Sequence, residues 1–242
     1  MSISNFLKAL RPSAGKCNES TRERWLEEVL KSLPENSRML DAGAGTQQYR
    51  KFCEHLNYVS QDFGEYDGQG DSAGLQMGGF DYGKLDIVSD ITSIPEPDSS
   101  FDAIMCIEVL EHLPDPVQAI KEFSRLIKPK GHLILTAPFC SLTHFSPYHF
   151  STGFNKYWYE MHLVVNGLKI VDISPNGNFF EYVAQEIDRI ASISKRYSKD
   201  RPGLLERLSV FITLRMLSRF SKKDSGSSGL LCFGYHVHAV KD

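Results

Sequence analysis

The segment Leu40-Asp41-Ala42-Gly43-Ala44-Gly45-Thr46 decides the fold class of this 242-residue chain. A short apolar strand over residues 37–41 leads into it, and a helix over residues 47–56 is predicted after it. Glycines at a strand-to-helix turn let backbone N–H groups approach a ligand closely. Asp62 ends the next predicted strand, 21 residues after Asp41, where doubly wound folds place an acid that binds ribose hydroxyls. The segment therefore predicts a site for a nucleoside-bearing cofactor.

Two other interpretations of this turn stay open on the glycines alone. Gly43 and Gly45 also suit a tight structural turn with no ligand. A dinucleotide site would need a third glycine where the chain has Gln48, which argues against close approach of a pyrophosphate.

Outward from this turn, predicted strands alternate with predicted helices, and no internal repeat interrupts the pattern. Alternation of this kind predicts an α/β fold with a mostly parallel sheet covered on both faces. We predict strands over residues 37–41, 58–61, 85–89, 101–107, 132–137, 169–174 and 231–240, and helices over 20–33, 47–56, 116–127, 154–166, 179–198 and 202–221.

In this order the motifs resemble those of the class I S-adenosylmethionine-dependent methyltransferases of the type 11 kind. Their first motif, acid-x-Gly-x-Gly, matches Asp41–Gly45, although Gln47 replaces a third glycine that is frequent there. Residues 106–116 and 126–132 resemble the segment after the fourth strand and the turn before the fifth. The resemblance implies a Rossmann-like, doubly wound sheet of seven strands with the last one antiparallel, and S-adenosylmethionine as cofactor. The cofactor-binding residues that it implies are Asp41, Gly43, Gly45, Asp62 (ribose), Asp90 and Ile91 (adenine loop) and Ile107.

Histidines lie where the acceptor of the methyl group is expected. Methyl transfer from a sulfonium is an in-line displacement, and a hydroxyl nucleophile also benefits from a general base. The candidate catalytic residues are His112, after the fourth strand, and His144 and His149, in an aromatic loop over residues 138–152. Tyr148 and His149 are the candidate substrate-binding residues. The structural alternatives are a capping histidine at position 112 and a packed surface loop over 138–152.

His144 and His149 are also residue types that bind metals. No clustered carboxylate is evident beside them in the sequence, so we expect no metal site.

Residues 64–83 differ in character from the rest of the chain, because seven of these twenty residues are glycine. Such a segment is costly to order, and we predict that it is mobile, as a gate or as a disordered insert.

Residues 179–224 form a predicted helical insert between the last two strands. Between Arg189 and Lys223 the charge is +8, whereas the remainder of the chain carries −11. Four interpretations stay open: a lid or homodimer element, contact with an anionic membrane, binding of a phosphate-bearing substrate, and a solvated basic face.

The overall composition is that of one globular domain over residues 1–242, with a net charge of −3 that excludes a nucleic-acid binder by bulk electrostatics. Five scattered cysteines without a CxxC pair suit the cytoplasm, and neither a signal peptide nor a membrane-spanning run is evident.

The sequence thus predicts a cytoplasmic enzyme that methylates a small or carrier-linked acceptor. The loop after the fifth strand and the turn over residues 176–178 resemble uncharacterised bacterial methyltransferases near surface-polysaccharide genes, which favours a sugar hydroxyl. The rivals are a non-catalytic scaffold that binds S-adenosylmethionine and a nucleic-acid methyltransferase. No Asn-Pro-Pro-Tyr or Asp-Pro-Pro-Tyr motif supports the latter.

Overall fold

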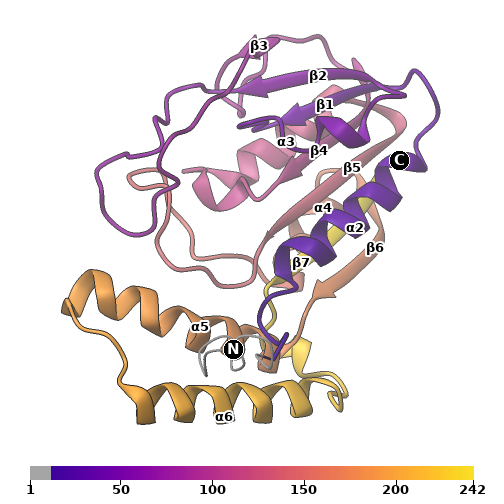
Figure 1. Cartoon of the computed structure of the whole chain (residues 1–242). Helices are drawn as coiled ribbons and strands as arrows, with labels where there is room; N and C mark the ends of the chain where they lie inside the picture. Colours follow the sequence, from indigo (N-terminus) through magenta and orange to yellow (C-terminus); the bar gives the residue numbers. More distant parts are fainter. Residues whose placement is uncertain (1–11) are drawn as a thin grey trace. The chain divides into compact units, whose positions relative to one another are not determined.

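The computed structural model describes residues 12–242, and a seven-stranded sheet in the order β3-β2-β1-β4-β5-β7-β6 organises it (Figure 1). The pairs among β3, β2, β1, β4 and β5 are parallel, whereas β7 runs antiparallel to β5. The predicted Rossmann-like sheet with an antiparallel last strand is therefore confirmed. The strands are β1 (Arg38–Ala42), β2 (Asn57–Asp62), β3 (Ile87–Val88), β4 (Phe101–Ile107), β5 (Ile127–Pro138), β6 (Leu168–Asn176) and β7 (Gly234–Lys241).

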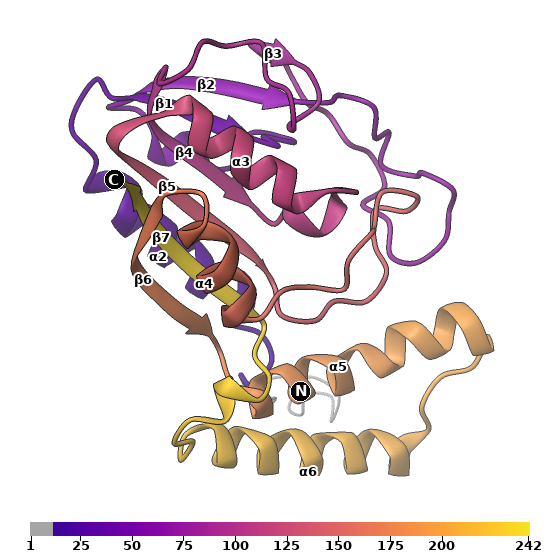
Figure 2. The ribbon, with the colours of Figure 1, turned by 180° about the vertical axis from the view of Figure 1, so that it is seen from behind.

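Helices cover both faces of the sheet. Helix α2 (Asn18–Lys31) lies in front of it in Figure 1, and α3 (Pro116–Leu126) and α4 (Lys156–Val164) lie in front in Figure 2. Covered on both sides, β4 is apolar along nearly its whole length, and it is buried at every residue but one. Helix α3 begins where the Asp115 side chain accepts the backbone N–H of Gln118 at 2.9 Å, with Pro116 in the first turn.

Two predicted elements differ from the structure. The helix predicted over residues 47–56 is wrong, because only the 3-10 turn η1 (Arg50–Phe52) forms there. Gln47 adopts a left-handed backbone (φ +57°), which a right-handed helix does not accommodate. The strand predicted over residues 85–89 is reduced to Ile87–Val88 at the sheet edge.

The chain divides into two compact units, which we describe separately. The sheet unit contains residues 23–174 and 234–242. The helical unit contains the described residues up to Arg22 together with Pro175–Phe233. Along the chain the helical unit therefore falls mainly between β6 and β7.

In the helical unit, α5 (Phe179–Ile193) and α6 (Leu204–Ser221) share a small core. Ala184 of α5 and Leu214 and Leu217 of α6 are buried in it, with Ala14 from the N-terminal segment. A π-helical turn, η3 (Ser194–Ser198), extends α5, and η4 (Ser227–Gly229) follows α6. Within residues 12–242, no helix combines the length and the apolar character that crossing a bilayer requires.

Candidate active site

The glycine loop, residues 43–46, follows the carboxyl end of β1. Gly43 and Gly45 have left-handed backbones, with φ of +77° and +50°. A Cβ on Gly43 would lie 2.6 Å from Cγ2 of Val109, so only glycine fits against this residue beyond the end of β4. Gly45 donates its backbone N–H to Oδ2 of Asp62 at 2.9 Å. The loop is therefore held between the ends of β2 and β4.

Two buried acids flank the glycine loop. Tyr58 donates its phenol O–H to Oδ2 of Asp41 at 2.5 Å, and burial, with a smaller contribution from Asp62, raises the pKa of Asp41 to about 7. Burial also raises the pKa of Asp62, although the backbone N–H groups of Gly45 and Gly64 oppose that shift. Carboxyl groups buried in this way are stabilised in their charged form by a cationic ligand.

The remaining predicted cofactor residues lie on the same edge of the sheet. Ile107 is the last residue of β4 and is buried. Asp90, just beyond β3, is exposed and accepts the backbone N–H and the hydroxyl of Thr92, each at 2.7 Å, in a turn that contains the buried Ile91. Because β3, β2, β1 and β4 are neighbours, the structure brings the seven predicted residues to the carboxyl ends of four adjacent strands.

Three histidines meet at the ends of the next two strands, and we call them the histidine cluster (His112, His144 and His149). His112 ends the 3-10 turn η2 (Leu110–His112) after β4, and the other two lie in the histidine loop, residues 139–155, between β5 and α4. The ring centroid of His144 lies 4.7 Å from that of His112 and 4.9 Å from that of His149. The three candidate catalytic residues are therefore neighbours in space.

Burial and neighbouring histidines lower the pKa of two members of this cluster, His112 and His149. Burial, with His144 and His149 nearby, lowers the pKa of His112 to about 3. Burial and His144 also lower the pKa of His149. Tyr148, the other candidate substrate residue, packs edge-on against Phe63 with 5.0 Å between ring centroids. Its hydroxyl therefore lies on the side of the donor site, where it donates to Glu65 at 3.4 Å.

Glu111 is a site residue that the sequence reasoning missed. Its side chain is 1% exposed, and its Oε1 lies 3.7 Å from Nε2 of His112 and 3.8 Å from Nε2 of His144. The premise that no carboxylate clusters with these histidines is therefore wrong. Helix α3 is capped by Asp115 and not by Glu111. The adjacency of Glu111 and His112 just after β4, the neighbour of β5, was the available signal.

The glycine-rich segment, residues 64–83, forms neither helix nor strand but is bonded to the histidine loop. Leu75 donates its backbone N–H to Thr143 at 2.9 Å, and Phe145 donates to the carbonyl of Leu75 at 3.1 Å. The side-chain amide of Gln76 donates to the buried hydroxyl of Ser146 at 2.6 Å. These bonds fix the backbone on both sides of His144.

The same segment also contacts the glycine loop. The side-chain amide of Gln47 donates to the carbonyls of Tyr82 and Lys84 at 2.8 and 2.9 Å. The ring of Phe80 lies 3.3 Å from the position that a Cβ on Gly45 would take. The segment thus links the donor side of the site to the histidine side, and its mobility stays a prediction.

Comparison with known proteins agrees with this geometry. Residues 40–135 match the family described as methyltransferase domain. The fold is similar to that of an S-adenosylmethionine-dependent methyltransferase from Archaeoglobus fulgidus (TM-score 0.56, 19% identity, 92% of this chain and 94% of that one). It is also similar to geranyl diphosphate C-methyltransferase from Streptomyces coelicolor A3(2) (TM-score 0.54, 12% identity, 93% and 79%).

The sheet order, the antiparallel last strand and these matches define the class: the fold is that of the class I S-adenosylmethionine-dependent methyltransferases, as the sequence predicted. Within this chain, the match to the methyltransferase domain covers residues 40–135.

Curated relatives match a shorter stretch. Ubiquinone biosynthesis O-methyltransferases from Alkalilimnicola ehrlichii and Xanthomonas oryzae pv. oryzae are 45% identical over 49 residues and 51% identical over 41 residues. The matched stretch spans 19% and 17% of the length of these relatives. Such short matches support a methyltransferase domain and do not identify the acceptor.

Proposed function

We propose that this protein transfers the methyl group of S-adenosylmethionine to a hydroxyl group on a small or carrier-linked acceptor. The observation that carries the proposal is the histidine cluster at the ends of β4 and β5, beside the strand ends that bear the glycine loop and Asp62. Donor chemistry fits these strand ends, because ribose hydroxyls donate well to a carboxylate and the sulfonium and ammonium charges suit the buried pair Asp41 and Asp62.

His149 is our candidate for the general base. Ser141 donates its hydroxyl to the carbonyl of Thr152 at 3.0 Å, so its oxygen accepts a hydrogen bond from Nε2 of His149 at 3.1 Å. Nδ1 of the neutral His149 ring then carries the lone pair. In the reaction the acceptor oxygen attacks the methyl carbon, the carbon–sulfur bond breaks, S-adenosylhomocysteine leaves, and the hydroxyl proton passes to His149.

A hydroxyl acceptor is also supported by the names of the short matches, which are O-methyltransferases. Tyr148 is half-buried and the neighbouring Phe150 is 53% exposed, so both can contact a ring. A sugar or another cyclic acceptor therefore suits the histidine loop, and the sugar hydroxyl favoured by the sequence stays part of the proposal.

The test separates donor binding from transfer. Calorimetry with S-adenosylhomocysteine should show binding to the wild-type chain and at least about tenfold weaker binding to Asp62→Ala. With a panel of hydroxylated sugars and phenols, His149→Ala should lose transfer while it binds S-adenosylhomocysteine as the wild type does. Tight binding of S-adenosylhomocysteine without methyl transfer to any acceptor would instead favour the non-catalytic scaffold.

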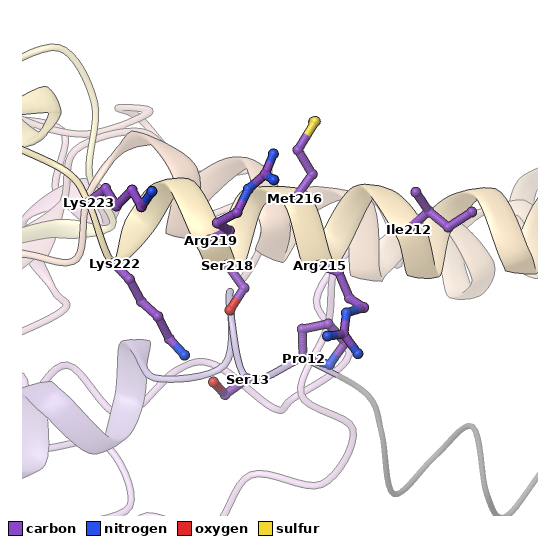
Figure 3. A pocket seen from close by; sticks show the side chains of 9 residues that line it. All are labelled: Pro12, Ser13, Ile212, Arg215, Met216, Ser218, Arg219, Lys222 and Lys223. Carbon is purple, nitrogen blue, oxygen red and sulfur yellow. The ribbon is translucent and has the colours of Figure 1, made fainter.

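We further propose that the helical unit rests on an anionic membrane surface. Helix α6 carries exposed apolar side chains in its first half, with Leu204 and Leu205 77% and 79% exposed, followed by Leu208 and Ile212. Cations follow on the same side of the helix. These cations are Arg215, Arg219, Lys222 and Lys223, and they line a pocket of about 810 Å³. The pocket, shown in Figure 3, is completed by Pro12, Ser13, Ile212, Met216 and Ser218.

Apolar side chains followed by cations on one helix face suit the boundary between acyl chains and phosphate headgroups. Arg215 lies beside Pro12, and Lys222 extends to the side of α6 on which Ser13 lies (Figure 3). Five free cysteine thiols suit the reducing cytoplasm, and the cytoplasmic leaflet carries the anionic lipids that these cations require. Co-sedimentation with anionic lipid vesicles tests this proposal, and self-association through α6 or binding of nucleic acid in place of vesicles would contradict it.

A further inference from the structure

Three electron-pair donors converge beside the proposed acceptor position. They are Oε1 of Glu111, Nε2 of His112 and Nε2 of His144, and all three atoms lie within 4.8 Å of one another. The carboxylate oxygen lies 3.7 and 3.8 Å from the two nitrogens, which is beyond hydrogen-bond distance in both cases. Glu111 and His112 come from the turn after β4 and His144 from the loop after β5, so the topology of the sheet holds the three together.

Backbone carbonyls orient both histidine rings. Nδ1 of His112 lies 2.5 Å from the carbonyl oxygen of Tyr148, and Nδ1 of His144 lies 2.8 Å from that of Leu142. A carbonyl oxygen only accepts, so each Nδ1 carries a hydrogen, and in a neutral ring Nε2 then carries the lone pair. Histidines that bind metals are oriented in the same way, by donating the other ring N–H to a carbonyl or carboxylate.

We propose that Glu111, His112 and His144 bind a divalent first-row transition-metal ion. Metal–ligand bonds of about 2.0–2.2 Å place adjacent ligand atoms roughly 3–3.5 Å apart. The two oxygen–nitrogen distances therefore have to shorten by a few tenths of an ångström. The two Nε2 atoms, which lie within 4.8 Å of each other, have to approach by up to about 1.5 Å, which a rotation of the His144 side chain in its loop would supply. Two imidazoles and one carboxylate favour Zn²⁺, Mn²⁺ or Fe²⁺ over Mg²⁺ and Ca²⁺, which prefer oxygen ligands. Three protein ligands leave positions on the ion open for a water molecule or a substrate oxygen.

The part of this ion in methyl transfer rests on the proposed function. An acceptor hydroxyl bound to a divalent cation is more acidic than the free hydroxyl. Its proton leaves to His149, the oxygen keeps the electron pair and attacks the methyl carbon, and the sulfur takes the electrons of the broken carbon–sulfur bond. The ion itself is neither oxidised nor reduced.

Metal binding to the full chain tests the proposal without any acceptor. The protein is stripped with a chelator, dialysed and titrated by calorimetry with Zn²⁺, Mn²⁺ and Mg²⁺ in separate runs, and Co²⁺ reports the ligand field by its visible spectrum. We expect one Zn²⁺ or Mn²⁺ per chain and much weaker Mg²⁺ binding. Glu111→Gln and His144→Asn should each weaken Zn²⁺ binding at least about 100-fold and abolish the Co²⁺ spectrum.

The matched control is His162→Asn, because His162 lies on α4 outside the cluster, and it should bind Zn²⁺ as the wild type does. Circular dichroism verifies the fold of each variant, and Zn²⁺ should raise the melting temperature of the wild type and of His162→Asn only. Absence of Zn²⁺ and Mn²⁺ binding to the wild type, or equal binding to the Glu111 and His144 variants, overturns the metal site. Titration of the same samples with S-adenosylhomocysteine keeps this result apart from the proposed function, because donor binding without metal binding overturns the metal site alone.

Discussion

Gly45 and Asp62 join the glycine loop to the neighbouring strand β2, since the backbone N–H of Gly45 donates to the Asp62 carboxylate at 2.9 Å. Asp62→Asn keeps the size of the side chain and removes the charge that ribose hydroxyls and Gly45 would share. Hydrogen bonds to a charged group contribute about 1.5–3 kcal/mol, so we expect roughly 10- to 100-fold weaker binding of S-adenosylhomocysteine by calorimetry. Asp98→Asn, which removes an exposed partner of Arg125, is the control and should bind normally. Unchanged binding by Asp62→Asn would remove this residue from the donor site.

The buried Asp41 makes stability depend on pH. Its pKa is about 7 in the folded protein, against 3.8 for an unperturbed group, so between these values the folded state binds more protons than the unfolded state. The free energy of unfolding should therefore fall as pH rises through this window, by at most about 1.4 kcal/mol per pH unit from this one group.

Urea unfolding at pH 5, 6 and 7 measures this dependence. Asp41→Asn should have a shallower dependence than the wild type, because its amide does not titrate. The same slope in both proteins would show that another group causes it.

Gly43 combines a left-handed backbone with close packing. Gly43→Ala places a Cβ 2.6 Å from Cγ2 of Val109 at φ +77°, and we expect a loss of about 1–3 kcal/mol in the free energy of unfolding. Val109→Ala removes the two methyl groups at 2.6 and 2.7 Å and leaves only its Cβ at 3.2 Å, together with the backbone strain. The double variant should therefore lose less than the sum of the two single variants. Gly79→Ala is the control, because its new Cβ meets nothing within 4 Å and its φ is not left-handed. Strict additivity in urea unfolding would show that the contact with Val109 does not restrict position 43.

The membrane proposal predicts vesicle binding that depends on charge and on the apolar end of α6. The wild type should co-sediment with vesicles that contain phosphatidylglycerol and not with pure phosphatidylcholine, and added salt should weaken binding. The double variant Arg215→Glu/Arg219→Glu should lose binding, and Leu204→Ser/Leu208→Ser should weaken it. Lys130→Glu/Lys169→Glu makes the same charge change on the sheet unit and is the control.

Equal loss of vesicle binding by this control would show that binding depends on the net charge of the protein and not on the cations of α6. Self-association of the wild type that Leu204→Ser/Leu208→Ser abolishes would instead identify α6 as a dimer surface. Binding of RNA or DNA in place of vesicles would revive the nucleic-acid methyltransferase.

The sequence predicted most of the sheet because its signals are local. Apolar runs mark β4 and β5, and Asp115-Pro116 marks the start of α3. The helix expected over residues 47–56 is wrong because Gln47 bonds to distant partners: Tyr82 in the glycine-rich segment and Lys84 just after it, 35 and 37 residues further along the chain.

In the candidate site, too, local signals were predictable from the sequence and contacts between distant residues were not. Asp41, Gly43, Gly45 and Asp62 are recognisable because each ends a strand or turns the chain at a fixed place. The contact of Glu111 with His144 joins residues from two strand ends, and no spacing along the chain reveals that distance.

Gln76 offers a direct test of the link between the two halves of the site. Gln76→Ala removes the amide that donates to Ser146, and the residues around His144 should lose protection against hydrogen exchange. Gln69→Ala, on an exposed part of the same segment, is the control. Equal protection in wild type and Gln76→Ala would show that the remaining backbone bonds suffice.

The glycine-rich segment contacts the glycine loop through Phe80 and the adjoining Gln47 through Tyr82, and it contacts the histidine loop through Leu75 and Gln76. Two ligands that order opposite ends of one segment share the entropy of ordering it, so whichever binds first lowers the entropic cost for the second. By thermodynamic reciprocity, the factor by which the methyl donor tightens acceptor binding equals the factor by which the acceptor tightens donor binding. From the connectivity of residues 64–83 we therefore predict positive cooperativity between the proposed donor and acceptor, and weakening that connection should make the two binding events independent.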